Sequence, residues 1–187
     1  GDIRDYDKVR EALNGCSAVM HLGALTSVVD SLSSPTEYEQ VNVIGTLNVI
    51  RACLEYGVRK LIYTSSAAIY GNPQKVPVSE KTYPDPQSPY ALTKITGEYY
   101  TRLLFSDKDW VILRLFNVYG PGQETSKSPG VIPTWVSLAR DGKDIVLYGG
   151  NQTRDFIHVS DVCEVFMLAL DSISQKTLNV GSGKESK

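Results

Sequence analysis

The chain has 187 residues, of which 42% are hydrophobic and 21% are charged, and its formal net charge is −2. This composition is typical of a globular protein with a sizeable core, and the balanced charge argues against a nucleic-acid partner or a membrane-surface partner. No apolar run reaches transmembrane length and no signal peptide opens the sequence, so we expect no membrane partner.

The first third of the chain reads as strand, helix, strand. Residues 16–24 and 59–66 are apolar runs typical of buried strands. Between them, residues 34–57 carry apolar side chains at helical spacing, with Ser34 as a candidate N-cap and Gly57 as a stop.

The alternation continues to the end of the chain. A polar, proline-rich loop at residues 71–87 precedes a helix predicted over residues 88–105 and a strand over residues 109–118. We further predict a helix over residues 131–142, a strand over 144–150, a helix over 158–172 capped by Ser160, and a strand over 176–181.

Alternating strands and helices indicate right-handed crossovers, and continuous apolar strands indicate a sheet covered on both faces. We therefore predict an α/β fold with a doubly wound parallel sheet. Ligands of such sheets bind at the carboxyl ends of the strands. Small or hydrogen-bonding residues follow the first three strands, at positions 23–26, 65–67 and 117–120.

The cysteines and histidines give no sign of a metal site. Cys16, Cys53 and Cys163 are widely spaced and none belongs to a CxxC pair. Each lies in an apolar segment, so we expect buried free thiols and a reducing, cytoplasmic location. His21 and His158 have no accompanying ligand cluster, so we expect no metal.

The stretch "SPYALTK" places Tyr90 four residues before Lys94, on one face of the predicted helix. One interpretation is a shared solvated face. The other is that the ammonium lowers the pKa of the phenol, so that the phenol acts as an acid/base. Bringing a tyrosine from its usual pKa near 10 to about 7 takes roughly 4 kcal/mol of preferential stabilisation of the phenolate.

Seven blocks in order decide which interpretation we prefer. They are "GDIRD", "VMHLGALTSVVDS", "NVIGTLNV", "YTSSAAIYG", "SPYALTK", "RLFNVYGPGQ" and "RDFIHVSDV". The chain resembles the extended short-chain dehydrogenases/reductases, specifically the NAD-dependent epimerase/dehydratase family, and most resembles its UDP-glucose 4-epimerase type. The resemblance implies a Rossmann-like fold, NAD as cofactor and a nucleotide-sugar substrate.

One family feature is missing from the sequence. There is no GxGxxG or GxxGxxG turn to hold the cofactor pyrophosphate, and the first residues already match the loop after the family's third strand. We therefore expect the middle of a longer enzyme, without the first strands and without the carboxyl-terminal end of the substrate lobe. Residues 1–120 would be a partial NAD-binding Rossmann domain, and residues 121–187 a partial nucleotide-sugar-binding region interleaved with it.

The resemblance assigns the catalytic groups. It makes Tyr90 the acid/base, Lys94 its partner and a ligand of the nicotinamide ribose, and Ser66 a hydrogen-bonding partner of the reacting sugar oxygen. Ala67 and Ala68 stand where 4,6-dehydratases of the family usually place acidic residues. This favours epimerisation at C4, in which hydride passes to NAD, the 4-keto sugar rotates and hydride returns.

Other readings stay open. The chain could catalyse a dehydratase, reductase or decarboxylase reaction of the same family, or be a truncated, non-catalytic binding protein. Family members often dimerise, and we expect a homodimer formed through the helices of residues 36–56 and 90–105.

Further positions carry over from the resemblance. Asn42, an amide on an otherwise apolar helix face, would hold the loops beneath the cofactor. Arg154 suits a diphosphate because a guanidinium can donate two parallel hydrogen bonds; its alternative is a surface ion pair with Asp155. The cofactor contacts implied are Asp2, Ile3, Leu22, Gly23, Ala24, Leu25, Thr26, Asn42, Ser65 and Phe116. The substrate contacts implied are Asn117, Val131, Val146, Tyr148 and Arg154.

Overall fold

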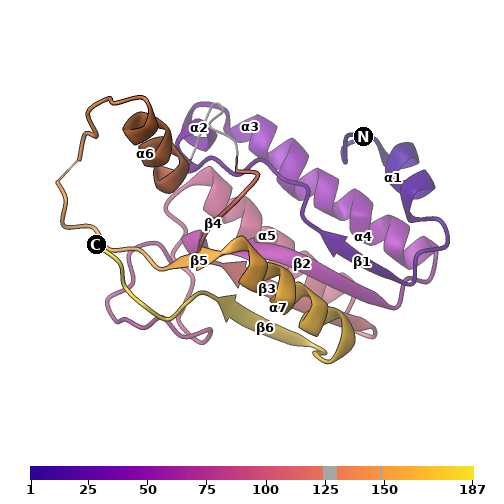
Figure 1. The fold of residues 1–187 in the computed structure, drawn as a ribbon. Coiled ribbons are helices and arrows are strands. Elements are labelled where there is room, and N and C mark those ends of the chain that lie inside the picture. The colour runs from indigo at the N-terminus through magenta and orange to yellow at the C-terminus, as the bar shows by residue number, and fades with distance from the viewer. Residues whose placement is uncertain (124–129, 148) are drawn as a thin grey trace.

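A parallel four-stranded sheet forms the centre of the computed structural model, which describes residues 1–123, 130–147 and 149–187 (Figure 1). Its strands are β1 (Ala18–His21), β2 (Lys60–Ser66), β3 (Asp109–Leu115) and β6 (Lys176–Val180), in the order β1-β2-β3-β6. All neighbours are parallel. The predicted α/β, Rossmann-like fold is confirmed.

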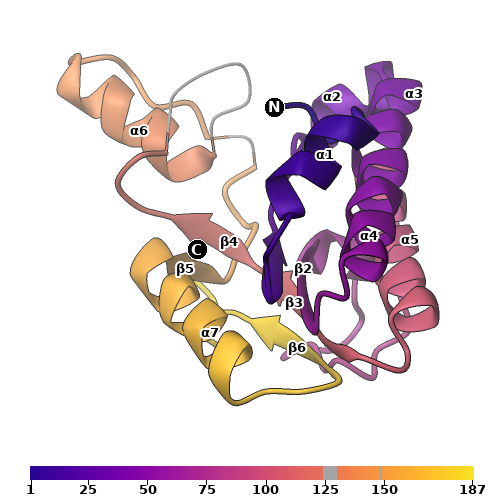
Figure 2. The same cartoon turned by 90° about the vertical axis from the view of Figure 1, so that its right-hand side faces the viewer.

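Helices cover both faces of the sheet (Figure 2). The helices α1 (Tyr6–Leu13), α4 (Gly45–Glu55) and α5 (Pro89–Leu104) lie on one face, and α7 (Val159–Asp171) lies on the other.

The apolar residues of β2 serve two cores. Leu61 packs with Ile50 and Phe105, whereas Ile62 packs with Val111 and Phe166. Successive side chains of a strand point to opposite faces, so a strand between two helical layers must be apolar at every position. This is why β2 and β3 read as continuous apolar runs.

The helix predicted over residues 34–57 forms, but in three consecutive parts. They are α3 (Pro35–Tyr38), a π-helical turn η1 (Glu39–Ile44) and α4. Ser34 makes no side-chain capping bond, and Gly57 follows the helix with a φ of 64°. π-helical turns are rare and occur frequently at functional sites; here the turn contains the buried Asn42.

Several boundaries differ from the predictions. The strand predicted over 109–118 divides, because Phe116 N bonds Val180 O and the chain then enters β4 (Asn117–Tyr119), which pairs with β5 (Phe156–His158). The N-cap of α7 is His158 rather than Ser160, because the helix begins directly after β5.

Two short helices were not predicted, and one predicted strand does not form over its described residues. The short helices α1 and α2 (Val28–Ser33) were not predicted, whereas α6 (Val131–Arg140) was. The strand predicted over 144–150 is wrong for residues 144–147, which are exposed and have no strand partner in the described chain. Apolar sequence makes a strand only where a neighbour supplies hydrogen bonds and cover. Position 148 lies outside the described residues.

The cysteines are all unpaired, but only Cys53 is buried. Cys16 and Cys163 are exposed, which corrects the expectation of three buried thiols. Cys16 lies in the turn after α1, and Cys163 lies on the outer side of α7, so neither enters a core. Within the described residues, no helix combines the length and the apolar character needed to cross a bilayer.

Gly97 gives a stability prediction, because α5 approaches β2 most closely there. A Cβ at position 97 would lie 2.1 Å from Tyr63 Oη and 2.4 Å from Tyr63 Cζ. Alanine favours a helix over glycine by about 1 kcal/mol, but overpacking a core costs about 1–3 kcal/mol. We expect Gly97→Ala to lower the free energy of unfolding in urea by about 2 kcal/mol. The loss should shrink in a Tyr63→Leu background, and an Ala variant as stable as wild type would contradict the packing described.

Candidate active site

The carboxyl ends of β1, β2 and β3 reach one edge of the sheet, at His21, Ser66 and Leu115. The first turn of α5 lies against the end of β2. Pro89 occupies the first helical position and the Ser88 hydroxyl accepts from Ala91 N at 3.1 Å, which fixes where this helix begins. Its start therefore places the first turn of α5 beside the strand end.

Tyr90 and Ser66 are brought together at this edge. The Ser66 hydroxyl lies near the Tyr90 phenol, and the edge of the Tyr38 ring packs against the Tyr90 ring at a centroid distance of 6.4 Å. Tyr90 is 8% exposed. Burial raises the pKa of Tyr90 above its ordinary value of 10, although the neighbouring Ser66 hydroxyl lowers it. The neighbouring ammonium was expected to lower the pKa of Tyr90, but in this chain by itself the pKa of Tyr90 is raised.

Lys94 lies one turn further along α5 and is 4% exposed. Its Nζ donates to Thr64 O at 2.9 Å and lies 5.5 Å from the centroid of the Tyr63 ring. In the described part of the chain it forms no salt bridge with a carboxylate. Burial lowers the pKa of Lys94 from 10.5 to about 8. The ammonium is therefore aimed at the end of β2 and is held there without a counter-ion.

Asn42 ties the loop after β1 to α5. Its Oδ1 accepts from Leu25 N at 2.8 Å, and its Nδ2 donates to Leu25 O at 3.0 Å and to Thr93 Oγ1 at 3.0 Å. Asn42 is 1% exposed, and Thr93 directly precedes Lys94. These three bonds join the loop after β1 to α5, and the role of Asn42 beneath the cofactor stays a prediction. The loop residues Leu22, Gly23 and Thr26 are exposed above them.

His21 ends β1 and is buried beside the candidate catalytic residues. Its Nε2 lies 2.9 Å from Thr46 Oγ1, and the Thr46 hydroxyl in turn donates to Asn42 O at 2.6 Å. Burial, and to a smaller extent the charge of Lys94, lower the pKa of His21 from 6.5 to about 3. The sequence did not single out this residue for the site.

The buried imidazole predicts a loss of stability in acid. The pKa of His21 is lower in the folded chain than in the unfolded chain. The contribution of neutral His21 to the free energy of unfolding is therefore intact above pH 6.5 and is lost as the pH falls from 6.5 toward 3. We expect about 2 kcal/mol less unfolding free energy at pH 5 than at pH 7 from this group. Urea unfolding of His21→Gln should show a smaller difference between the two pH values than unfolding of the wild type. An equal difference in His21→Gln and the wild type would contradict the prediction.

The remaining predicted cofactor positions are dispersed over this edge. Asp2 is exposed and paired with Arg4, and the hydrogen bonds from Arg4 lower the pKa of Asp2 to about 2. Ile3 packs against Gly23 and Gly45. Ser65 is buried and donates to Glu98, and half-buried Phe116 follows β3.

The predicted substrate positions are less closely grouped. Asn117 is exposed and its amide donates to Asp155 O at 2.9 Å. Val131 opens α6 and Val146 follows it, both exposed, while Tyr148 lies outside the described residues.

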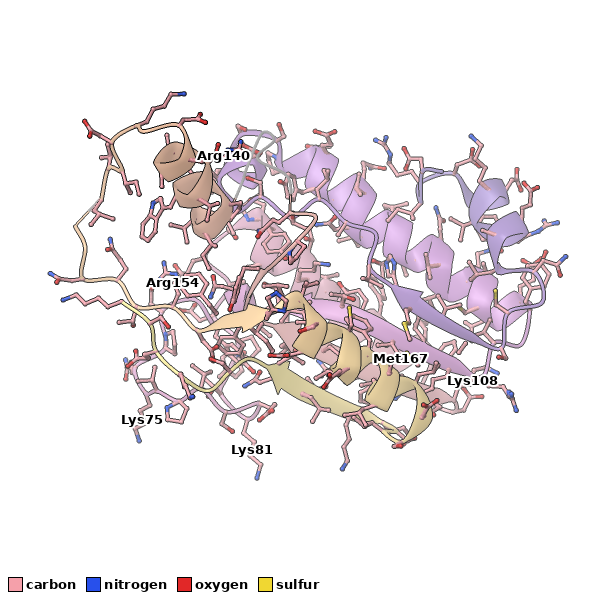
Figure 3. The ribbon with its side chains drawn as sticks, viewed as in Figure 1. Lys75, Lys81, Lys108, Arg140, Arg154 and Met167 are labelled. Carbon is pink, nitrogen blue, oxygen red and sulfur yellow. The ribbon has the colours of Figure 1, made fainter. Side chains whose placement is uncertain are left out.

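Arg154 is exposed, and the ion pair with Asp155 that was its alternative interpretation does not form. It forms no salt bridge with Asp155 in the described chain, and the Asp155 carboxylate instead accepts from Ser182 and Gly183. Figure 3 places Arg154 and Arg140 toward one end of the molecule and Lys108, which precedes β3, toward the other.

Comparison with known proteins agrees with this geometry. The sequence profile described as "NAD dependent epimerase/dehydratase family" matches residues 1–181. The chain belongs to the NAD-dependent epimerase/dehydratase family. NAD is the cofactor of this family.

Named relatives in the family catalyse different reactions. UDP-glucose 4-epimerase of Mycolicibacterium smegmatis is 36% identical over 89% of this chain and 55% of its own length. UDP-N-acetylglucosamine 4-epimerase of Methanobrevibacter ruminantium, solved with UDP-N-acetylmuramic acid, is 36% identical with a TM-score of 0.95 over 100% of this chain and 61% of that one. A double mutant of dTDP-glucose 4,6-dehydratase of Streptomyces venezuelae, solved with NAD, is 30% identical with a TM-score of 0.90 over 100% and 58%.

The chain spans 51% to 62% of the length of the curated relatives compared with it.

Hydrogen-bond donors at the carboxyl edge of the sheet fit a dinucleotide. The Lys94 ammonium carries three N–H donors, and the described residues take one of them, at Thr64 O. Free ammonium donors suit the hydroxyl groups of a ribose. Gly23 and Ala24, in the loop held by Asn42, allow close approach of a cofactor backbone.

Proposed function

We propose that this chain belongs to an enzyme that epimerises a nucleotide sugar, UDP-hexose at C4, with NAD. The observation that carries the proposal is the grouping of the Ser66 hydroxyl, the buried Tyr90 phenol and the buried Lys94 ammonium at the carboxyl edge of the sheet. A hydroxyl–phenol–ammonium set of this kind moves protons and needs a separate group to carry electrons.

Each residue has a distinct task in this proposal. Tyr90 takes the proton of the sugar hydroxyl and later returns it, while Ser66 hydrogen-bonds the same oxygen. Lys94 holds the ribose and keeps positive charge near the phenol. Bound NAD would supply the hydride acceptor and donor for the sugar carbon, and its positive charge would favour the phenolate form of Tyr90 that burial disfavours.

A second candidate reaction is elimination of water, because a 4,6-dehydratase is among the structural relatives. Ala67 and Ala68, the first residues of η2 (Ala67–Tyr70), follow Ser66 directly. Neither side chain can protonate or deprotonate a sugar ring. We therefore favour epimerisation over elimination, reduction or decarboxylation.

The deciding experiment incubates the full-length gene product with NAD and UDP-glucose, UDP-N-acetylglucosamine or UDP-glucuronate in turn, and identifies the products by NMR. A C4 epimer in any of the three supports the proposal. A stable keto sugar or released CO₂ would replace it by a dehydratase or decarboxylase. No turnover, and no NAD binding by calorimetry, would leave the non-catalytic binding protein as the function.

For the substrate we propose that Arg154 binds the diphosphate. Its exposed guanidinium has no carboxylate partner in the described chain, and its Nη1 donates to Thr153 O, which leaves further N–H groups for phosphate oxygens. We propose that residues 1–120 bind NAD and that residues 121–187 contribute to the sugar site while returning β6 to the main sheet.

We also propose a homodimer in the cytoplasm. The neighbouring helices α4 and α5, which belong to the two predicted segments, expose Leu54 at 39%, Tyr99 at 53% and Leu103 at 69%. Large apolar side chains exposed together on helices are typical of a protein–protein interface, and three unpaired thiols are typical of a reducing compartment. We expect Leu103→Glu to convert a dimer into a monomer in sedimentation velocity; a wild-type monomer would contradict the dimer.

A further inference from the structure

A buried ion pair lies beneath the candidate active site, and the sequence did not single it out. Glu98 on α5 is 0% exposed and Arg114 on β3 is 4% exposed. The pair is bidentate: Arg114 Nε donates to Glu98 Oε1 at 2.9 Å and Nη2 donates to Oε2 at 2.7 Å. We refer to Glu98 and Arg114 as the buried pair. The sequence signal was the spacing of Tyr90, Lys94 and Glu98, each four residues apart on one helix.

The buried pair connects α5 to the end of β2. Glu98 Oε1 also accepts from Ser65 Oγ at 2.6 Å, and Ser65 is the register partner of Arg114. Ser65 directly precedes Ser66, whose hydroxyl lies near the Tyr90 phenol. One carboxylate therefore holds the strand that carries Ser66 against the helix that carries Tyr90 and Lys94.

The same guanidinium fixes the segment that follows Ser66. Arg114 Nη1 donates to Tyr70 Oη at 2.7 Å and to Glu80 O at 3.0 Å. Tyr70 Oη donates to Asn179 Oδ1 of β6 at 2.7 Å. The chain leaving β2 is thus tied to two further strands, so that Ser66 is held on both sides along the sequence.

The energetics of this arrangement point to geometry rather than to net stability. Two buried charges lose much of their attraction to the cost of leaving water, and a well-packed apolar pair is often as stable. The orientation of their hydrogen bonds, however, is specific, and a displacement of about 1 Å in a catalytic group can cost about 100-fold in rate.

We propose that Glu98 and Arg114 are positioning residues, which set the distance between Ser66 on β2 and Tyr90 and Lys94 on α5. The inference rests on the proposed function for its kinetic readout. It assigns the buried pair to the chemical step and not to substrate or cofactor binding, because among the described residues neither Glu98 nor Arg114 forms a hydrogen bond with loop 22–26 or with Arg154.

The test replaces both charges at once, since removing one would leave the other buried and unpaired. In the Glu98→Met/Arg114→Leu double variant of the full-length gene product, we expect kcat to fall about 100-fold while KM and the NAD dissociation constant stay within about twofold. Arg102→Met is the matched control, because Arg102 also contacts Glu98 Oε2, at 3.3 Å, but is part-exposed and on the outer side. It should leave kcat unchanged.

A second readout does not depend on turnover. The ¹³Cζ resonance of Tyr90 at pH 7, assigned with Tyr90→Phe, reports the surroundings of the phenol oxygen, which include the Ser66 hydroxyl. It should move in the double variant and stay in Arg102→Met. A folded double variant with wild-type kcat, or with an unmoved resonance, would overturn the positioning role. A wild-type protein that binds NAD but turns over no nucleotide sugar would overturn the proposed function instead, and the resonance would still decide the positioning role.

Discussion

Turnover of the nucleotide sugar is expected to fall about 1,000-fold when Tyr90 is replaced by phenylalanine, the loss typical of removing a general acid/base. The change deletes one oxygen from a side chain that is 8% exposed and lies near the Ser66 hydroxyl. The ring still packs against Tyr38, so the fold and the NAD dissociation constant should be preserved. Steady-state kinetics and calorimetry on the full-length gene product measure the two quantities.

Tyr99 supplies the control for this prediction. It lies on the same helix but is 53% exposed, so Tyr99→Phe should leave kcat unchanged. If Tyr90→Phe retained wild-type turnover, another group would have to carry the proton and Tyr90 would be a packing residue only.

Lys94→Met is expected to make the protein more stable while it abolishes turnover. Burial lowers the pKa of Lys94 from 10.5 to about 8, which corresponds to about 3 kcal/mol of lost stability in the charged form at pH 7. Methionine keeps the aliphatic volume and removes the charge. Unfolding in urea should therefore require about 3 kcal/mol more at pH 7.

The pH dependence has a definite sign. The folded pKa of Lys94 is below the unfolded value, so wild type gains stability as the pH rises from 8 to 10.5. The difference in unfolding free energy between the wild type and Lys94→Met should therefore shrink over that pH range.

Lys60→Met is the matched control for Lys94→Met. Lys60 is similarly buried, but its Nζ pairs with Asp109 at 3.1 Å and donates to Ile173 O at 2.7 Å, so its loss should destabilise the protein. A Lys94→Met variant less stable than wild type would show that the bond to Thr64 outweighs the desolvation of the ammonium.

The sheet could be predicted from the sequence because residues 61–63 of β2 and 110–113 of β3 are consecutive apolar residues, a pattern typical of strands covered on both faces. The helix start at Ser88 could be predicted because an N-cap serine precedes a proline at the first helical position. The segment 144–147 has an equally apolar sequence, but pairing and cover are properties of the whole fold, so its exposure could not be seen locally.

The candidate site was predictable to a similar degree. Spacing places Tyr90 and Lys94 on one face of a helix, and the resemblance to the family assigns the roles expected of these two residues and of Ser66. The direction of the Lys94 ammonium, toward Thr64 O, does not follow from spacing. The partners of Glu98 could not be predicted either, because Ser65 and Arg114 lie 33 and 16 residues away and meet it only when β2, β3 and α5 assemble.

The unequal exposure of the three cysteines has a practical consequence. Burial raises the pKa of Cys53 to about 12, so this thiol is both enclosed and protonated at neutral pH. A maleimide dye should therefore couple only to Cys16, near the layer of α1, and to Cys163, on α7 across the sheet. The native chain thus carries two attachment points on opposite sides of its core, ready for fluorescence distance measurements on cofactor addition without any engineered residue.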